Sequence, residues 1–398
     1  MARVAVALCA LLATASAQCT VEKAQPYFSR SVYEFSVDLL TRLALDTDYH
    51  FVASPLSPWT LLAHTSLGAA DATLHELNSV LRLLPHKCYS MRFFEIVRGI
   101  YAPAGQTTLE GASTIVVDER YPLNESFERQ VKNAGITDVK RLPMDNYEYV
   151  AATVNNYVRT ATNGAIDDVV QASDLENAVM TIVDVLRFKG NWQIPFPVEE
   201  TEESSFYDEM NNKIGSVNLM FITSQFNFKS MDLINSTILE IPYSDQRFSM
   251  LLFLPYEGMK LSNVIYSLKE ISLKSIFALF KEGEPQEISL QLPRFKITSD
   301  LSNLKELLVD MGLKSVFESR AQFPGISDNE LYISNIMQKA DIEVTEEGTT
   351  ASGATTAEFT FKSLPYTVAA NKPFFFMIVD KNTVTPVFAG AYSKPNLF

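Results

Sequence analysis

The sequence predicts an α+β fold that forms one large domain. Helical and strand-like segments interleave along the 398 residues, and no linker rich in Pro, Gly or Ser divides them. Hydrophobic residues make up 47% of the chain and charged residues 20%, a balance that supports a large core rather than disorder. No repeat of fixed period is evident.

The first segment has the composition of a secretory signal. Within residues 1–17, Arg3 supplies the positive start, Val4 to Ala13 the apolar run, and Ala15 to Ala17 the small residues before a cleavage site. No later run is long and apolar enough for a membrane span. We therefore expect a secreted, extracellular protein with no membrane partner, whose domain comprises residues 18–398.

The N-terminal half is predicted to be mainly helical. From Phe28 to Leu45 the apolar residues follow a helical period and form a broad amphipathic stripe. The apolar run Phe51 to Ala53 predicts a short buried strand, after which Pro58 suits a helix start with Ser57 as its N-cap. The other elements predicted here are helices at Trp59–Leu67, Asp71–Leu81, Glu125–Ala134 and Ala151–Ala161 and a strand at Thr114–Val117.

The C-terminal half is predicted to consist mainly of strands. The run Met180 to Phe188 is rich in β-branched and apolar residues and ends at a turn that contains Gly190. Several strands are indicated between Ser204 and Leu254. The other elements predicted here are strands at Ile288–Ile297, Phe374–Asp380 and Val387–Ala391 and a helix at Leu304–Met311.

Net charge and motif content exclude several classes of function. The formal net charge of -14 argues against nucleic acid and anionic membranes as partners. The 4 histidines lie between His50 and His86 without an accompanying carboxylate pattern, so no metal site is expected. The sequence has no G-x-S-x-G, H-E-x-x-H, Walker loop or dinucleotide fingerprint. We therefore expect neither an enzyme nor a bound cofactor.

Two features matter only if the chain is secreted. Cys19 and Cys88 remain after removal of the leader and can pair in an oxidising compartment, although two separate thiols are the alternative. The triplets that begin at Asn124 and Asn235 fit the pattern for N-glycosylation. Neither the pairing nor the glycan occupancy follows from the sequence alone.

The segment from Thr345 to Asn371 has an unusual composition. From Gly348 to Ala357 it contains only Gly, Ala, Ser and Thr. In an extended conformation Thr349, Ala351 and Gly353 share one face. Two interpretations are open: a polar linker, or a segment that can become a strand with one apolar face.

Short motifs from both halves of the chain occur in a characteristic order and spacing. They are Phe51 to Ser57, Phe188 to Trp192, Leu292 to Phe295, Asn371 to Phe374 and Val387 to Gly390. Together they resemble the serpin family, and the resemblance covers nearly all of the chain after the leader. It implies a large central mixed β-sheet of about five strands, additional sheets, about eight or nine surrounding helices and an exposed reactive-centre loop.

The resemblance also implies a function and a partner. In inhibitory serpins a target protease cleaves the loop, which then inserts into the central sheet as an extra strand and carries the acylated enzyme away. Here the loop would run from about residue 346 to residue 371 of a monomer. The small residues after the hinge suit rapid insertion. The residues that resemble the hinge of inhibitory members are Glu346, Glu347, Gly348, Thr349, Ala351 and Gly353.

The loop length of the family places the cleaved bond at Lys362–Ser363. A lysine there suits a trypsin-like serine protease, whose specificity pocket holds a buried carboxylate, and such a protease is the expected target. Phe361 suits the hydrophobic subsite of papain-like cysteine proteases of the cathepsin L type, which remain an alternative target. Phe359 and Thr360 are expected to lie in neighbouring subsites. A non-inhibitory carrier or storage protein on the same scaffold is a further alternative.

A last group of residues is implied to control the opening of the central sheet. They are Ser54, Ser57, Asp184, Gln338 and Trp192. The family usually has Asn at the position of Asp184 and His at the position of Gln338. Because a glutamine amide can donate to a carboxylate, we expect these two residues to form a contact that keeps the fold. The effect of this exchange on the rate of insertion stays open.

Overall fold

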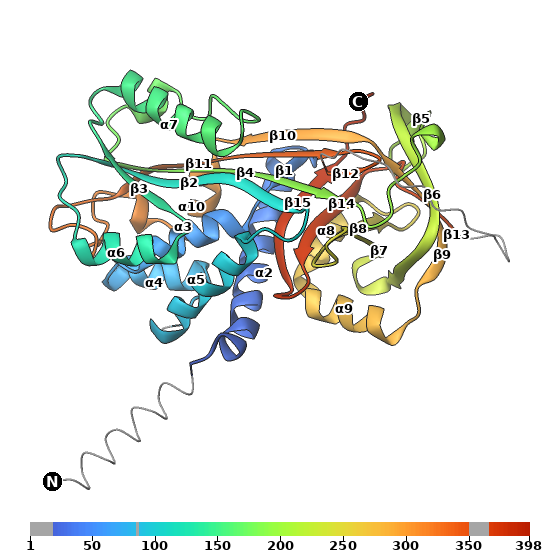
Figure 1. Ribbon diagram of the computed structural model, residues 1–398, viewed down its shortest axis with the longest axis horizontal. Helices are drawn as coiled ribbons and strands as arrows, with labels where there is room; N and C mark the ends of the chain where they lie inside the picture. Colours follow the sequence, from blue (N-terminus) through green and yellow to red (C-terminus); the bar gives the residue numbers. More distant parts are fainter. Residues whose placement is uncertain (1–18, 85–86, 350–365) are drawn as a thin grey trace, which may run out of the picture.

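The computed structural model describes residues 19–84, 87–349 and 366–398, which form two large β-sheets (Figure 1). The central sheet has, in spatial order, β10 (Phe295–Leu301), β11 (Ile333–Val344), β12 (Gly348–Thr349), β4 (Met180–Asn191), β2 (Thr108–Asp118) and β3 (Asp138–Leu142). The second sheet has β1 (Phe51–Ala53), β15 (Thr385–Tyr392), β14 (Phe374–Asp380), β8 (Phe248–Pro255), β7 (Ser236–Pro242), β6 (Lys213–Met231), β9 (Gln286–Pro293) and β13 (Tyr366–Ala369), with β5 (Glu202–Tyr207) beside β6.

The sheets differ from the expectation in two ways. The central sheet has six strands among the described residues rather than about five, because β12 lies between β11 and β4. This strand has only two residues, yet Thr349 pairs with Val344 on one side and with Gly190 on the other. The expected additional sheets are joined into one, because the long strand β6 pairs with β7 along one part and with β9 along another.

Nine α-helices accompany the sheets within the described residues, in agreement with the expected number. They are α2 (Val21–Asp46), α3 (Leu56–Ser66), α4 (Asp71–Val80), α5 (Lys87–Tyr101), α6 (Glu125–Ala134), α7 (Tyr147–Ala161), α8 (Leu261–Ser267), α9 (Leu273–Glu282) and α10 (Leu304–Asp310). The α+β class predicted from the sequence is therefore confirmed.

Helices cover both faces of the central sheet. Helix α7 lies on one face, whereas α2, α3 and α5 lie on the opposite side (Figure 1). Strand β4 is apolar on both faces for this reason. Val183 and Val185 pack with Val154 of α7 in one cluster, while Ile182 and Leu186 point into the main core. Alternate residues of β4 therefore face opposite sides of the sheet. This alternation decides to which side the carboxylate of Asp184 points.

The helix boundaries show where local sequence was a good guide. Helix α6 spans the predicted range Glu125–Ala134 and ends before Gly135, which has a φ of 69°. Helix α3 begins at Leu56, not after Pro58, and Pro55 occupies the N-cap position. Ser57 is therefore not the cap. Helices α5, α8 and α9 were not predicted, although α9 begins with a capping box at Ser272 and buries Leu273, Ile276 and Phe280 at helical spacing.

Two further features concern the ends and the surface of the molecule. Cys19 and Cys88 form a disulfide with a Cα–Cα distance of 6.2 Å. This bond ties the chain two positions before α2 to the first turn of α5. In the parts of the chain that the structure describes, no helix has the length and apolar character needed to cross a membrane.

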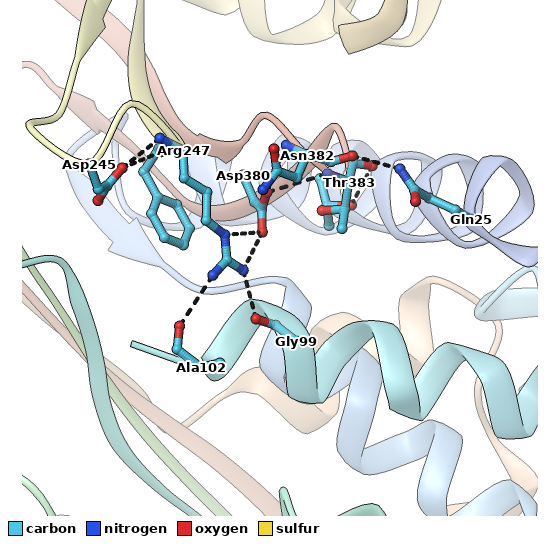
Figure 2. A network of polar contacts seen from close by, with 10 residues as sticks. Gln25, Gly99, Ala102, Asp245, Arg247, Asp380, Asn382 and Thr383 are labelled. Atoms are coloured by element: carbon cyan, nitrogen blue, oxygen red, sulfur yellow. Dashed lines mark hydrogen bonds and ion pairs between the residues drawn. The ribbon is translucent and has the colours of Figure 1, made fainter. Parts of the chain in front are cut away.

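A buried ion pair joins distant parts of the fold (Figure 2). The guanidinium of Arg247 donates twice to Oδ2 of Asp380, at 3.0 and 2.6 Å, and also to the carbonyls of Gly99 and Ala102 at 2.7 and 3.2 Å. The side chain of Asp380 is fully buried. Its other oxygen accepts the backbone N–H of Asn382 at 2.9 Å. Arg247 therefore connects the end of α5 to the turn between β14 and β15.

Candidate functional site

The candidate site is the boundary between strands β4 and β11 of the central sheet. Over most of their length these two strands pair directly in parallel, from Ile333 opposite Met180 to Asp341 opposite Arg187. Beyond this paired stretch, near Val344 of β11 and Gly190 of β4, strand β12 lies between the two strands and pairs with both. We name this β4–β11 boundary the insertion slot. One end of the slot is already occupied by a short strand, and the rest is closed.

A tight turn leads from β11 into β12. The backbone N–H of Thr345 donates to the carbonyl of Gly348 at 2.7 Å, and the N–H of Gly348 donates back to Thr345 at 3.2 Å. The hydroxyl of Thr345 also donates to the Gly348 carbonyl, at 3.1 Å. This turn reverses the chain between neighbouring strands, so β12 runs antiparallel to β11 and to β4.

Glycine is the only residue type that fits at position 348. Its φ is 150°, which L side chains rarely adopt. A Cβ atom at this residue would lie 2.2 Å from the carbonyl oxygen of Gly190 and 2.5 Å from the Cα of Asn191. Any side chain would therefore push β12 away from β4. The absence of a side chain at Gly348 thus allows the close approach of the two strands.

Thr349 points into the core. Its side chain is fully buried, and its hydroxyl lies 3.0 Å from the hydroxyl of Tyr243. Tyr243 is itself buried and stacks on Trp192 with a ring distance of 4.6 Å. Position 349 therefore lies on the apolar side of an extended segment, in agreement with the alternation read from the sequence.

Trp192 and Glu346 fix the turn to the body of the molecule. The indole N–H of Trp192 donates to the carbonyl of Thr345 at 3.0 Å, and its backbone N–H donates to Glu347 at 2.9 Å. The carboxylate of Glu346 accepts the hydroxyl of Thr201 at 2.8 Å and lies 3.4 Å from Arg294. This set of contacts holds the start of β12 in place without filling the rest of the insertion slot.

Halfway along the closed part of the slot, two side chains link β4 to β11. Asp184 and Gln338 are direct register partners. The amide Nε2 of Gln338 donates to Oδ2 of Asp184 at 2.6 Å and to the carbonyl of Ser54 at 2.9 Å. The other carboxylate oxygen of Asp184 accepts the hydroxyls of Ser57 and of Ser113, the latter at 2.7 Å. Parting β4 from β11 must break the link between Asp184 and Gln338.

Burial sets the electrostatics of this link. Asp184 is fully buried, and its contacts are neutral donors from β2, β11 and α3. Burial raises the pKa of Asp184 above its ordinary value, although the hydrogen bonds from Ser113, Ser57 and Gln338 oppose this shift. Burial also raises the pKa of Tyr101 in α5, with a smaller contribution from the charge of Asp184. A buried carboxylate without a cation is a costly element to place between two paired strands.

Replacing Gln338 by Glu is expected to weaken the closed sheet. Two carboxylates 2.6 Å apart cannot both ionise, so the variant must hold a proton at neutral pH. The native state then binds protons more tightly than the unfolded chain, and its stability falls as the pH rises through the raised pKa. We expect a loss of about 2 kcal/mol at neutral pH that shrinks on acidification. Urea unfolding at neutral and acidic pH measures it.

The exposed Gln193 supplies the control for this experiment. Gln193→Glu adds the same charge at the surface and should change the urea midpoint little at either pH. An equal loss in both variants, or a Gln338→Glu loss that grows on acidification, would contradict a role for the buried carboxylate pair.

The structure brings one group of predicted residues together and leaves another untested. Ser54, Ser57, Asp184 and Gln338 meet in one hydrogen-bonded cluster, and Trp192 lies with Glu346, Glu347, Gly348 and Thr349 at the occupied end of the slot. The predicted residues that lie outside the described part of the chain are Ala351, Gly353, Phe359, Thr360, Phe361, Lys362 and Ser363.

Sequence reasoning missed four residues of the site: Ser113, Tyr243, Arg294 and Thr201. Ser113 is the register partner of Asp184 on β2, and strand alternation would have found it once β2 was known to pair with β4. The other three come from elements distant in sequence. Arg294 belongs to the motif Leu292 to Phe295, but that motif was not assigned to the site, and no local signal marks Tyr243 or Thr201.

The remaining predicted groups are scattered. The amide nitrogen of Asn124, the atom that a glycan would modify, donates to the carbonyl of Pro324 at 3.0 Å. Asn235 lies in a left-handed turn between η3 (Asp232–Ile234) and β7. Within the described ranges, no group of three or more His, Cys, Asp or Glu residues is arranged to hold a metal ion.

Comparisons with known proteins agree with this arrangement. The family described as Serpin (serine protease inhibitor) matches residues 30–395. The chain is 30% identical to alpha-1-antiproteinase F of Cavia porcellus, covering 94% of this chain and 91% of that one. It is 29% identical to a serine protease inhibitor of Cyanea capillata, over 86% and 92% of the two chains. Human thyroxine-binding globulin in complex with its ligand has a TM-score of 0.83 at 24% identity, covering 92% of this chain and 98% of that chain.

Proposed function

The chain belongs to the serpin family, and from this premise we propose that it is a secreted, monomeric inhibitor that traps a trypsin-like serine protease. In this proposal the protease cleaves the loop at Lys362–Ser363, and the freed segment enters the insertion slot as a new strand. The relatives are named as protease inhibitors rather than as enzymes, as the absence of catalytic motifs led us to expect. Secretion rests on the leader at residues 1–17.

The observation that carries the proposal is the position of β12. Gly348 and Thr349 already pair between β4 and β11, so insertion has to extend an existing strand rather than start one. Extending a strand avoids the entropic cost of first bringing its end into the sheet. Thyroxine-binding globulin shares the fold and is named for binding thyroxine, so the fold by itself does not establish inhibition. The occupied end of the insertion slot is the feature that favours inhibition.

The register of β12 supports the same proposal. Gly348 pairs with Asn191 and Thr349 with Gly190, and Thr349 also pairs with Val344. If both registers continue, position 355 falls opposite Asp184 on one side and opposite Gln338 on the other. Position 355 shares its face with Thr349, which is buried.

Thr355 would therefore enter the place where the two side chains now meet. A threonine hydroxyl can donate to the carboxylate of Asp184 and accept from the amide of Gln338. It would satisfy both groups after their mutual hydrogen bond has broken. In this proposal, hydrogen bonds from Thr355 of the inserted loop replace the hydrogen bond between Asp184 and Gln338 that insertion breaks.

Replacing Thr355 by Val tests this register. The variant keeps the shape of the side chain but removes its hydroxyl, which leaves two buried polar groups unsatisfied after insertion. We expect about a threefold rise in the number of inhibitor molecules consumed per trapped protease. Thr356→Val is the matched control, because residue 356 lies on the opposite face and should trap normally. A threefold rise in both variants, or in neither, would contradict the continued register.

Incubation with two kinds of protease tests the proposed function. A denaturant-resistant complex with trypsin, together with a released fragment that begins at Ser363, is the expected result. Lys362→Ala should abolish that complex. Trapping of a cathepsin L-like enzyme alone, lost in Phe361→Ala, would favour the cysteine-protease alternative. Cleavage that gives neither a complex nor a rise in melting temperature would favour a carrier or storage role.

A further inference from the structure

An exposed aromatic side chain marks the point where the described chain resumes after the loop. Tyr366, the first residue of β13, is 62% exposed. Its ring rests against Phe228 of β6, with ring centres 5.4 Å apart and planes inclined at 53°. Strand β13 lies at the edge of the second sheet beside β9 (Figure 1). This places a large, accessible ring at the edge of the sheet, where the described chain resumes in the last part of the proposed reactive-centre loop.

The backbone holds Tyr366 in a fixed position. It pairs with Ile288 in the parallel register of β13 and β9. Val368 of the same strand is only 6% exposed and anchors it to the core, and the N–H of Ala370 donates to Gln291 at 2.8 Å. The ring is therefore organised before any partner arrives, which lowers the entropy cost of using it in a contact.

Covalent reach places this ring near the proposed cleaved bond. Tyr366 lies three positions after Ser363, so their Cα atoms are at most roughly 11 Å apart in any conformation. A protease–inhibitor interface covers about 800 Å² on each partner, which corresponds to a disc with a radius of about 16 Å. A protease bound at Lys362–Ser363 would therefore have Tyr366 within its footprint.

We propose that Tyr366 is a specificity-determining contact for the target protease, received by an apolar hollow beside the subsites that bind residues after the cleaved bond. This inference rests on the proposed function. Tyrosine is among the residues most often found at the energetic centre of protein interfaces, because it offers a large ring and a hydroxyl at a small entropy cost. Phe228 behind the ring keeps it directed outward.

The proposed contact of Tyr366 acts only when the protease first binds. Residues after the cleaved bond remain on β13 when the freed segment moves, so Tyr366 does not enter the insertion slot. It should therefore strengthen the first encounter with the protease, without changing how many cleaved molecules are trapped. This separation distinguishes a recognition contact from a structural one.

Binding to an inactive protease tests the inference directly. The probe is trypsin whose catalytic serine is replaced by alanine, and the measurement is its dissociation constant for the full chain. We expect Tyr366→Ala to weaken binding about tenfold, and Tyr366→Phe to retain most of the affinity. The control is Tyr266→Ala, since Tyr266 is 60% exposed on α8, where Lys269 lies 3.7 Å from its ring centre. This control should bind like the unchanged chain.

The outcomes separate this inference from the function on which it rests. Equal affinity of the unchanged chain and Tyr366→Ala would overturn the inference alone. Weaker binding of Tyr366→Ala, with an unchanged melting temperature and unchanged trapping stoichiometry, would support it. If the unchanged chain binds the probe through Tyr366 but forms no complex with active trypsin, the trapping mechanism fails and the contact stands. A chain that does not bind the probe overturns both.

Discussion

Thr349→Arg is expected to convert the proposed inhibitor into a substrate. The side chain at this position is fully buried, with its hydroxyl 3.0 Å from Tyr243. An arginine there must either carry its charge into the core without a partner or push β12 out of the insertion slot. Because expulsion costs less than burial of an unpaired charge, the loop would lose its first inserted residue and insertion would slow.

In the proposed mechanism, slow insertion gives the protease time to complete hydrolysis and leave. Each 1.4 kcal/mol added to the barrier for insertion changes the ratio of trapping to release about tenfold. We therefore expect Thr349→Arg to be cleaved at the same bond as the unchanged chain, but to require at least about ten times more molecules per protease inactivated. Titration of trypsin activity measures the ratio, and sequencing of the fragment confirms the bond.

Thr350→Arg is the matched control for this prediction. It adds the same side chain one residue later, on the opposite face of an extended segment, where the charge does not have to enter the core. This control should retain most of the inhibition. If Thr349→Arg inhibits at the stoichiometry of the unchanged chain, strand insertion is not the mechanism.

Arg247→Met is expected to cause the largest loss of stability. The change removes the two donors that Arg247 directs to Asp380, whose side chain is fully buried. It also leaves the carbonyls of Gly99 and Ala102, at the end of α5, without these donors. Breaking a buried ion pair by removing one partner costs about 3–5 kcal/mol, because the other charge stays buried. Urea unfolding of the intact chain should show a loss of this size.

Two further variants define the source of the loss. Arg320→Met removes an exposed pair with Glu318 and should change stability by less than about 1 kcal/mol. Adding Asp380→Asn to Arg247→Met removes the uncompensated charge and should recover part of the loss. A double variant no more stable than Arg247→Met would assign the effect to packing around the arginine rather than to the ion pair.

Part of the candidate site could be predicted from local sequence. Alternation along an extended chain was enough to place residue 349 on the apolar face, and burial of Thr349 agrees. The sequence also pointed to Ser54, Ser57, Asp184 and Gln338 through the resemblance to a family, and the structure brings them into contact. It did not reveal Ser113 or Tyr243, because the partners of a strand residue depend on which strands pair.

Local sequence also misread one role. Ser57 precedes a proline and has the chemistry of a helix cap, but α3 already begins at Leu56, two residues before the predicted start at Pro58. The Ser57 hydroxyl donates to Asp184 instead. A hydroxyl can satisfy either a helix end or a neighbouring side chain, and the choice depends on what packs beside it. Here a carboxylate from a strand more than a hundred residues away is the competing acceptor.

The sequence by itself determined the types of many elements and the family of the chain, because helical and strand periods and short motifs are local properties. Only the tertiary structure decided that Gly348 and Thr349 lie between β4 and β11, and that Asp184 meets Gln338 across the same boundary. The physical reason is that a strand satisfies its backbone N–H and carbonyl groups on a neighbour that can come from any part of the chain. The pairing of β12 with both β4 and β11 is therefore a property of the assembled fold.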